Sequence, residues 1–320
     1  MGHIPKVVCI NGNGIGQCCN VVRIPKKGET AIPTNLHYCK DSGKGVNCAI
    51  VIGRLGGDVS YIGKAGKDDG GELNEQWLQE SAVHLEHFWL QDGIKTSLGL
   101  ILVAENGENL IFNFDSPESD ITVEEAVSHL KELEGAEYMI TGFEIPHSVA
   151  YESARVGCEL GMKVFINPSP FDDASEVVEM PFVDTMAVNE IEALMLLGTT
   201  KEETNDWMDA AKRLCEKYKV KNVLITLGGD GAVHYGERGL GHVSGIKVKV
   251  VDESGAGDAF LAVFVQCLIW GMSVQEALEY SNKYCAWLVQ KPGEDGVIGK
   301  YLYLNEMKEV LDFFESKEEK

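Results

Sequence analysis

The chain has 320 residues, of which 44% are hydrophobic and 24% charged, as in an ordinary globular protein. This length suits one large α/β domain with an appendage, or two small domains. The formal net charge of -22 argues against non-specific binding to nucleic acid or to an anionic membrane, so we expect neither as a partner. Any phosphate site must therefore be built from local donors.

The N-terminal residues 1–6 lead directly into the strand-like residues 7–10, without a charged and then apolar leader. The longest apolar run, around residues 259–270, is too short to span a bilayer. We therefore expect a cytoplasmic protein. The nine cysteines show no C-x-x-C pairing and no histidines at zinc spacing, which favours reduced and mostly buried thiols.

The first predicted strand is followed by a loop rich in glycine and asparagine, residues 11–17. A dinucleotide fingerprint would need glycine where Gln17 stands, and no helical pattern follows. Open α/β sheets bind ligands at the carboxyl ends of their strands, so Asn11 and Asn13 are candidates to reach a substrate. The alternative is that they are plain turn residues.

A second glycine-containing stretch, residues 41–49, opens a predicted helix that continues to Leu55. It carries Lys44 and Asn47 beside the glycines. A Walker A loop is excluded, because its pattern occurs nowhere in the chain. As an isolated feature, Lys44 would be read as a solvated loop lysine.

Two β pieces are predicted among these βα units. Residues 29–38 are extended, and residues 96–114 indicate a hairpin that turns at residues 105–108. Such insertions suggest a small β lid over an α/β core, formed by approximately residues 14–40 and 96–115.

From residue 121 onward, helices and strands alternate regularly. This alternation predicts a parallel sheet covered on both faces, with right-handed crossovers. No repeat or low-complexity linker interrupts it, so we expect one domain over residues 1–320, with a frayed tail at residues 315–320. The predicted strands are residues 59–63, 138–142, 164–168, 185–188 and 222–226, and the predicted helices are residues 71–81, 123–133, 148–160 and 206–218.

Residues 246–250 alternate apolar and basic side chains, which predicts a strand with one covered face. The small residues Gly255, Ala256 and Gly257 then allow a tight turn into an almost wholly apolar helix. Free backbone N–H groups at a helix N-terminus attract anions. Asp258 either matches the helix dipole, or takes the proton of a hydroxyl beside a bound anion, as phosphoryl transfer requires.

Together these motifs resemble the ribokinase-like, or PfkB, carbohydrate kinases over nearly the whole chain and in the same order. The resemblance rests on residues 43–47, with Gly56 and Gly66 behind them, and on residues 252–260. Between these signatures, residues 189–192 resemble the N-E-x-E motif and residues 226–231 the T-L-G-x-x-G nucleotide loop of the family. The fold implied is a three-layer α/β/α core with a mostly parallel sheet and a small inserted β lid.

The resemblance further implies an enzyme that transfers the γ-phosphoryl group of ATP to a sugar hydroxyl. Asp258 matches the catalytic base, and the amides of Gly255, Ala256 and Gly257 match the anion hole. The positions that match sugar contacts are Asn11, Asn13, Gly43, Lys44, Asn47 and Glu144. Those that match the nucleotide side are Asn189, Thr226, Gly228, Gly231 and Asn282.

Two ion sites are also implied. Glu192 matches the carboxylate linked to Mg²⁺, and Asp252, with backbone carbonyls near Gly293, matches a monovalent-cation site found in many members, for which K⁺ is the candidate ion. In the family the lid often also forms a dimer contact, so a second copy of the chain is an expected partner.

Four positions depart from the family pattern. Asn13 stands where ribokinases usually carry aspartate, and Ser42 where a glycine or alanine is usual. Glu253 replaces a small residue beside the cation position and leaves K⁺ activation open, whereas Val263 indicates altered helix packing.

Two other functions stay open at this stage. A nucleoside kinase would need an apolar slot for the base, for which Tyr38, Phe112 and Phe114 of the lid are candidates. A sugar-binding or regulatory protein without catalysis could use the same fold.

Overall fold

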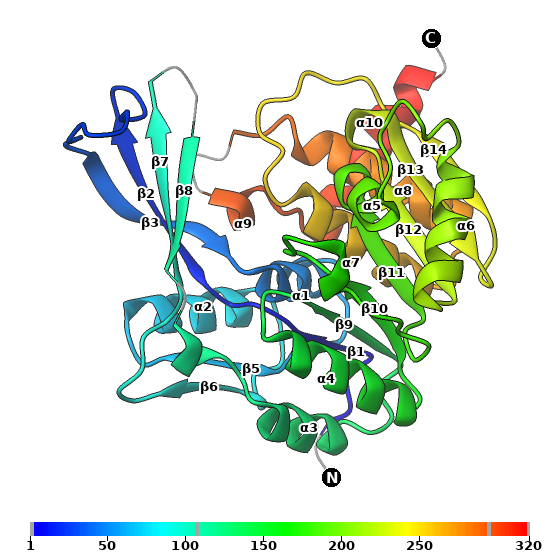
Figure 1. Ribbon diagram of the computed structural model, residues 1–320, viewed down its shortest axis with the longest axis horizontal. Helices are drawn as coiled ribbons and strands as arrows, with labels where there is room; N and C mark the ends of the chain where they lie inside the picture. The colour runs from blue at the N-terminus through cyan, green and yellow to red at the C-terminus, as the bar shows by residue number, and fades with distance from the viewer. Residues whose placement is uncertain (1–2, 106–108, 115, 293–295, 319–320) are drawn as a thin grey trace.

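The computed structural model, which describes residues 3–105, 109–114, 116–292 and 296–318, has a three-layer α/β/α core with a smaller sheet at its side (Figure 1). The central sheet has eight strands, in the order β4 (Val59–Tyr61), β1 (Val7–Ile10), β9 (Tyr138–Gly142), β10 (Lys163–Asn167), β11 (Thr185–Asn189), β12 (Asn222–Thr226), β13 (Gly231–Gly236) and β14 (Gly241–Ser244). Six of them, β4, β1, β9, β10, β11 and β12, run parallel, β13 pairs antiparallel with β12, and β14 pairs antiparallel with β13.

Helices cover both faces of the sheet because its strands are apolar on both sides. In β1, Val7 and Cys9 pack into one core cluster, and Val8 and Ile10 into the other. The layer on the Val7 side contains α1 (Lys44–Arg54), α2 (Asp69–Glu80), α7 (Ala256–Ile269), α8 (Val274–Leu288), α9 (Gly296–Lys300) and α10 (Leu304–Glu318). The opposite layer contains α3 (Val123–Glu132), α4 (His147–Glu159), α5 (Glu190–Leu197) and α6 (Trp207–Tyr218). The expected core architecture is confirmed.

The smaller sheet comes from the two segments in which we expected a lid, and it projects from one side of the core in Figure 1. Its strand order is β3 (Thr34–Ser42), β2 (Ile15–Val21), β7 (Leu98–Ala104) and β8 (Asn109–Phe114). Strands β7 and β8 pair antiparallel as the predicted hairpin requires, while residues 106–108 of its turn lie outside the described residues. A separate pair, β5 (Gly63–Gly66) and β6 (Phe88–Gln91), lies beneath it.

The smaller sheet touches the core again near the C-terminal end of β3. A Cβ on Gly296, the first residue of α9, would collide with the backbone of Lys40 in β3. Gly296 also has a φ of 77°, which favours glycine. The strand and the short helix are therefore in direct backbone contact.

The strand predicted at residues 246–250 is wrong. Within the described stretch from Gly245 to Val250 the structure has no regular element. Ile246 and Val248 pack against the core, whereas Lys247 and Lys249 are exposed, so one-sided burial of an extended segment produces the alternation without a neighbouring strand. The antiparallel strands β13 and β14 were not predicted from the sequence.

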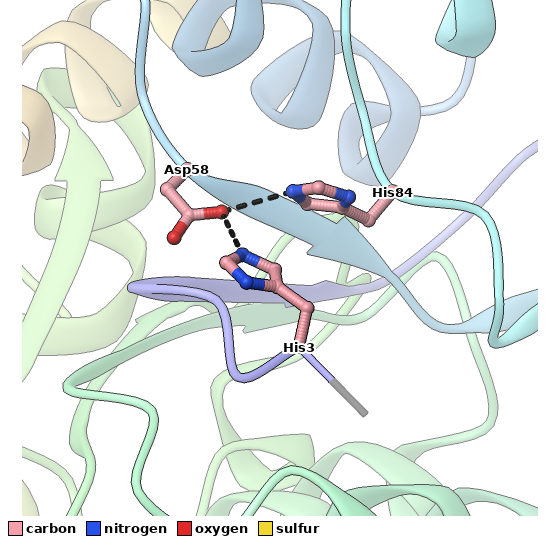
Figure 2. Close-up of side chains that lie close together, drawn as sticks. All are labelled: His3, Asp58 and His84. Carbon is pink, nitrogen blue, oxygen red and sulfur yellow. Dashed lines mark hydrogen bonds and ion pairs between the residues drawn. The ribbon is translucent and has the colours of Figure 1, made fainter. Parts of the chain in front are cut away.

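A cluster of two histidines and an aspartate lies at the N-terminal edge of the central sheet (Figure 2). The Nε2 atoms of His3 and His84 lie 2.8 and 2.9 Å from the same Oδ1 of Asp58. The Asp58 carbonyl accepts from Lys6 and Val7, at the start of β1. Among the described residues this is the one group of three potential ligands close enough for a metal ion, and it lies at the edge opposite to Asn11, which follows β1.

Helix α7 crosses the middle of the larger core cluster, and its residues Ala259 to Cys267 are all buried. In the part of the chain that the structure describes, no helix has the length and apolarity needed to cross a membrane.

Replacing Phe264 in the middle of α7 should destabilise the fold strongly, because its ring is fully buried. We expect Phe264→Ala to lower the free energy of unfolding by about 3–5 kcal/mol. Val178→Ala is the control, because Val178 is 50% exposed, and it should change the free energy by less than about 1 kcal/mol. Urea denaturation followed by circular dichroism measures both, and equal losses would contradict this account of the core.

Candidate active site

The start of α7 has the geometry of an anion-binding helix terminus. Gly255 caps the helix with a φ of 74°, in the left-handed region that favours glycine. A Cβ at this position would also collide with Val297. The backbone N–H groups that open the helix therefore follow a bend that a larger residue would strain, and Asp258 is the acidic residue of the first turn.

The Asp258 carboxylate is held by two side chains from the first turn of α1. Asn47 Nδ2 donates to Asp258 Oδ2 at 3.0 Å, and Lys44 Nζ lies 3.7 Å from Oδ1. The side chain of Asp258 is only 13% exposed. A carboxylate used solely to match a helix dipole would lie in solvent, so this environment favours a functional role for Asp258.

Glycines allow α1 to begin against the loop that follows β1. A Cβ on Gly43 would collide with the backbone of Gly12, and one on Gly45 would come within 2.8 Å of the Asn11 carbonyl. The Gly-Lys-Gly sequence is therefore a close-packing requirement as well as a motif. It brings Lys44 and Asn47 next to the carboxyl end of β1.

Glu144, which follows β9, joins the same network. Its backbone N–H donates to Asn11 Oδ1 at 3.1 Å, and its Oε2 accepts from the Lys44 N–H at 2.6 Å. The structure thus brings together five of the six residues predicted for sugar contacts, namely Asn11, Gly43, Lys44, Asn47 and Glu144, with Asp258 beside them.

Asn13, the sixth, points into an adjacent set of backbone contacts. Its Nδ2 donates to the Lys64 carbonyl at 2.7 Å, and its own carbonyl accepts from Asn74 Nδ2 at 2.5 Å. The amide nitrogen is thereby engaged, so Asn13 would offer a ligand its neutral oxygen.

Burial and like charges shift the acidic groups of the site. Burial raises the pKa of Glu144 to about 7, and burial together with Asp258 raises the pKa of Asp41 to about 6. The neighbouring Asp258 carboxylate raises the pKa of the Lys44 ammonium, which stays charged. Sequence reasoning missed Asp41, although it directly precedes Ser42 and Gly43.

Asn189 and Glu192 form a reciprocal capping box at the start of α5. Asn189 Oδ1 accepts from the Glu192 N–H at 2.8 Å, and Glu192 Oε2 accepts from the Asn189 N–H at 2.9 Å. This accounts locally for the N-E-x-E spacing. Glu192 is also close enough to contribute to the raised pKa of Lys44, after Asp258 and Glu144.

The loop after β12 is shaped by glycines. Gly228 and Gly231 have φ angles of 54° and 108°, and a Cβ on Gly231 would collide with the Val243 carbonyl. Gly231 pairs with Ser244 of β14, whose carbonyl accepts from Asn282 Nδ2 at 3.0 Å. Thr226, the glycines and Asn282 are therefore neighbours, beyond the strand ends that also carry Asn189.

A model of the pfkB family carbohydrate kinases matches residues 15–297. The chain belongs to this family. It is therefore a carbohydrate kinase, a phosphotransferase with an alcohol acceptor.

Individual relatives agree with this membership. Ribokinase of Staphylococcus aureus is 25% identical over 294 residues, covering 92% of this chain and 96% of that protein. The bifunctional ribokinase/ribose-5-phosphate isomerase A of Fructilactobacillus sanfranciscensis is 24% identical over 294 residues, and this match spans 92% of the chain but only 54% of the relative. The fold matches Arabidopsis thaliana ribokinase complexed with ribose and ATP, with a TM-score of 0.81, 23% identity and coverage of 97% and 99% of the two chains.

The monovalent-cation site that the family resemblance implies does not fit the residues around Asp252. Its Oδ2 lies 2.7 Å from Lys300 Nζ, and the same ammonium donates to the carbonyls of Asp252 and Ser254 at 3.3 and 2.9 Å. Lys300 was not predicted from the sequence. Gly293, whose neighbouring carbonyls were expected to complete the site, lies outside the described residues.

The raised pKa of Glu144 gives a pH-dependent stability. Below pH about 4.5 both states are protonated, but as the pH rises toward 7 the unfolded chain ionises while the folded chain resists ionisation. The free energy of unfolding should fall through this window by on the order of 1–3 kcal/mol. Glu144→Gln should lack this loss, so its melting temperature should rise relative to that of the wild type between pH 5 and pH 8.

The exposed Glu309→Gln serves as the control and should follow the wild type at every pH. Calorimetry across the pH range measures the three proteins. If Glu144→Gln runs parallel to the wild type, Glu144 does not have a raised pKa.

Proposed function

We propose that the protein is an ATP-dependent sugar kinase in which Asp258 is the general base. The observation that carries this proposal is the position of Asp258, a nearly buried carboxylate at the N-terminus of α7, fixed by Asn47 and Lys44. Asp258 Oδ accepts the proton of the sugar hydroxyl as its oxygen bonds to the γ-phosphorus and the bond to ADP breaks.

The residues around Asp258 have distinct tasks in this reaction. In this proposal the backbone N–H groups of Gly255 and Gly257 face the negative charge that develops on the transferred group. The Ala256 N–H, which was also expected in the anion hole, donates to the Glu253 carbonyl at 3.1 Å and would have to leave it to join them. In the same proposal Asn11, Glu144 and the amide oxygen of Asn13 bind sugar hydroxyls and orient the reacting one. The Lys44 ammonium lies 3.7 Å from Asp258 Oδ1 and also lowers the pKa of Glu144 electrostatically, so it offsets the carboxylate charge of the site.

ATP is proposed as the phosphoryl donor, bound over the loop after β12 by Thr226, Gly228 and Gly231, with Asn189 and Asn282 at its sides. The structurally similar Arabidopsis thaliana ribokinase is complexed with ribose and ATP, which supports ATP as the donor. Mg²⁺ would neutralise phosphate charge when bound. Glu192 would hold it as an oxygen ligand, since its carboxylate is partly exposed and, of its two oxygens, Oε2 accepts from the Asn189 N–H.

The geometry favours a sugar over a nucleoside. Four residues lie side by side across the small sheet: Tyr38 of β3, Gln17 of β2, Leu100 of β7 and Phe112 of β8. The rings of Tyr38 and Phe112 therefore lie on the same face of this sheet. Asp41 lies on the other face, beside Gly16, and interacts with Asp258. The lid aromatics therefore point away from the Asp258 side of their own chain, where a base would have to stack.

The same aromatic face is proposed to pair with a second copy of the chain. Leu36, Phe112 and Phe114 are 63%, 46% and 55% exposed on it, and they form an apolar row on a sheet surface. Such a row is a docking surface in the small sheet, away from the carboxylates of the active site.

Asp258→Asn should abolish most of the activity, because the amide cannot accept the hydroxyl proton. We expect kcat to fall by about 10²–10⁴-fold, with ribose first on a panel of pentoses, hexoses, sugar acids, amino-sugars and nucleosides. Asp209→Asn is the matched control, since Asp209 is an exposed aspartate in the first turn of α6. A coupled assay of ADP release measures both, and an Asp258→Asn rate within tenfold of the wild type would mean that the base is another residue.

If calorimetry finds sugar binding but no substrate on the panel drives ATP turnover, the protein is a binding or regulatory member of the fold.

Phe114→Lys should convert a dimer to a monomer at micromolar concentration, measured by light scattering during gel filtration. The control is Val178→Lys, at a position that is 50% exposed on the core. Association that survives Phe114→Lys would place the interface elsewhere.

A further inference from the structure

The ammonium of Lys300 is buried against residues 252–257, the anion-binding loop that leads into α7. Its side chain is 2% exposed, and it lies at the end of α9, 48 residues away in sequence from Asp252. An ammonium has three N–H donors. Here three oxygens accept them: Asp252 Oδ2 at 2.7 Å, the Ser254 carbonyl at 2.9 Å and the Asp252 carbonyl at 3.3 Å.

This oxygen set is what an alkali cation would require. Carboxylate and carbonyl oxygens replace the water shell of such an ion. With Lys300 in place, these oxygens are already engaged, and a second positive charge beside the ammonium would be repelled at low dielectric. The ammonium and a metal ion therefore exclude one another at Asp252.

The contacts of Lys300 connect it with the proposed transfer site. Asp252 Oδ1 accepts from the Ser254 N–H at 3.0 Å, so the ammonium and this turn together fix the residues that lead into Gly255. The next residue, Tyr301, places its hydroxyl 3.4 Å from the Gly255 carbonyl, where it donates. Helix α9 thus supports the bend from which the backbone N–H groups of α7 emerge.

Lys300 also balances the local charge. Burial is the main cause of the raised pKa of Asp41; repulsion from Asp258 and, more weakly, from Asp252 adds to it, and Lys300 opposes the rise. Without Lys300, three carboxylates would crowd the approach of a phosphate group.

We propose that Lys300 is a tethered cation, which takes the place of a bound monovalent metal ion, holds the anion-binding loop in its active conformation and makes the kinase independent of K⁺. Lys300 is a positioning residue, since it acts through Asp252 and Ser254. The kinetic part of this proposal rests on the proposed function, whereas the structural part does not.

The wild-type protein provides the first test. Sugar phosphorylation and the melting temperature are measured in KCl and in choline chloride at equal ionic strength. We expect kcat to agree within about twofold and Tm to be the same in the two salts, because Lys300 already engages the oxygens of Asp252 and Ser254 that K⁺ would need. Activation by K⁺ of tenfold or more, or a clear rise of Tm in KCl, would overturn the proposal.

The second test uses Lys300→Met, which keeps the apolar stem and removes the charge. In choline chloride we expect kcat to fall by about 10- to 100-fold, since the loop is no longer held in place. In KCl or NH₄Cl the lost activity should return at least in part, and Tm should rise by about 3 °C or more as the ion enters the vacated oxygens. Lys308→Met, at an exposed position of α10, should behave as the wild type.

The outcomes separate the two proposals. If no sugar is phosphorylated, the proposed function fails, and the dependence of Tm on K⁺ in the wild type and in Lys300→Met still tests the tethered cation. A folded Lys300→Met protein with unchanged kcat and no response of Tm to K⁺ would refute it. If this variant does not fold, the wild-type comparison of the two salts decides.

Discussion

The contact between the N-termini of α1 and α7 is the constraint on which the rest of the site depends. Asn47 and Asp258 are 211 residues apart in sequence, yet their side chains are hydrogen bonded at 3.0 Å. Both helix starts are shaped by glycine, at Gly43 and Gly45 on one side and Gly255 on the other. The glycines let backbone approach backbone, and the polar side chains then meet where the strands end. The geometry of the proposed active site is thus a consequence of helix packing.

This strongly acidic chain needs local positive charge to bind phosphate groups. The chain carries a net charge of -22, and the site itself contains buried carboxylates. Two lysines are set among them: Lys44 beside Asp258 and Lys300 beside Asp252. Each lysine is held in place by the carboxylate that it neutralises, so its positive charge stays at a fixed position in the site. Such preorganised charge costs little reorganisation when the phosphoryl group arrives.

The sequence was sufficient for features that depend on local pattern. The αβ alternation, the buried α7 and the helix start at Asp258 all follow from periodicity and from small residues at turns. The alternation of apolar and basic residues at 246–250 led to a wrong strand prediction. Such alternation indicates that one side of an extended segment is buried, but it does not indicate that a neighbouring strand is present. Lys300 and Asp41 could not be assigned, since a lysine or aspartate gives no sign in sequence of the distant oxygens or charges that will surround it.

The backbone contact between Gly296 and Lys40 joins the small sheet to the helix that carries Lys300. Strand β3 belongs to the small sheet, while α9 carries Lys300 and supports Gly255 through Tyr301. A sugar that orders the small sheet would therefore also order the loop that receives the phosphate, and a nucleotide that orders the loop would favour the same position of the sheet. The two ligands would then bind cooperatively and reciprocally, with a coupling free energy set by the stiffness of one short helix.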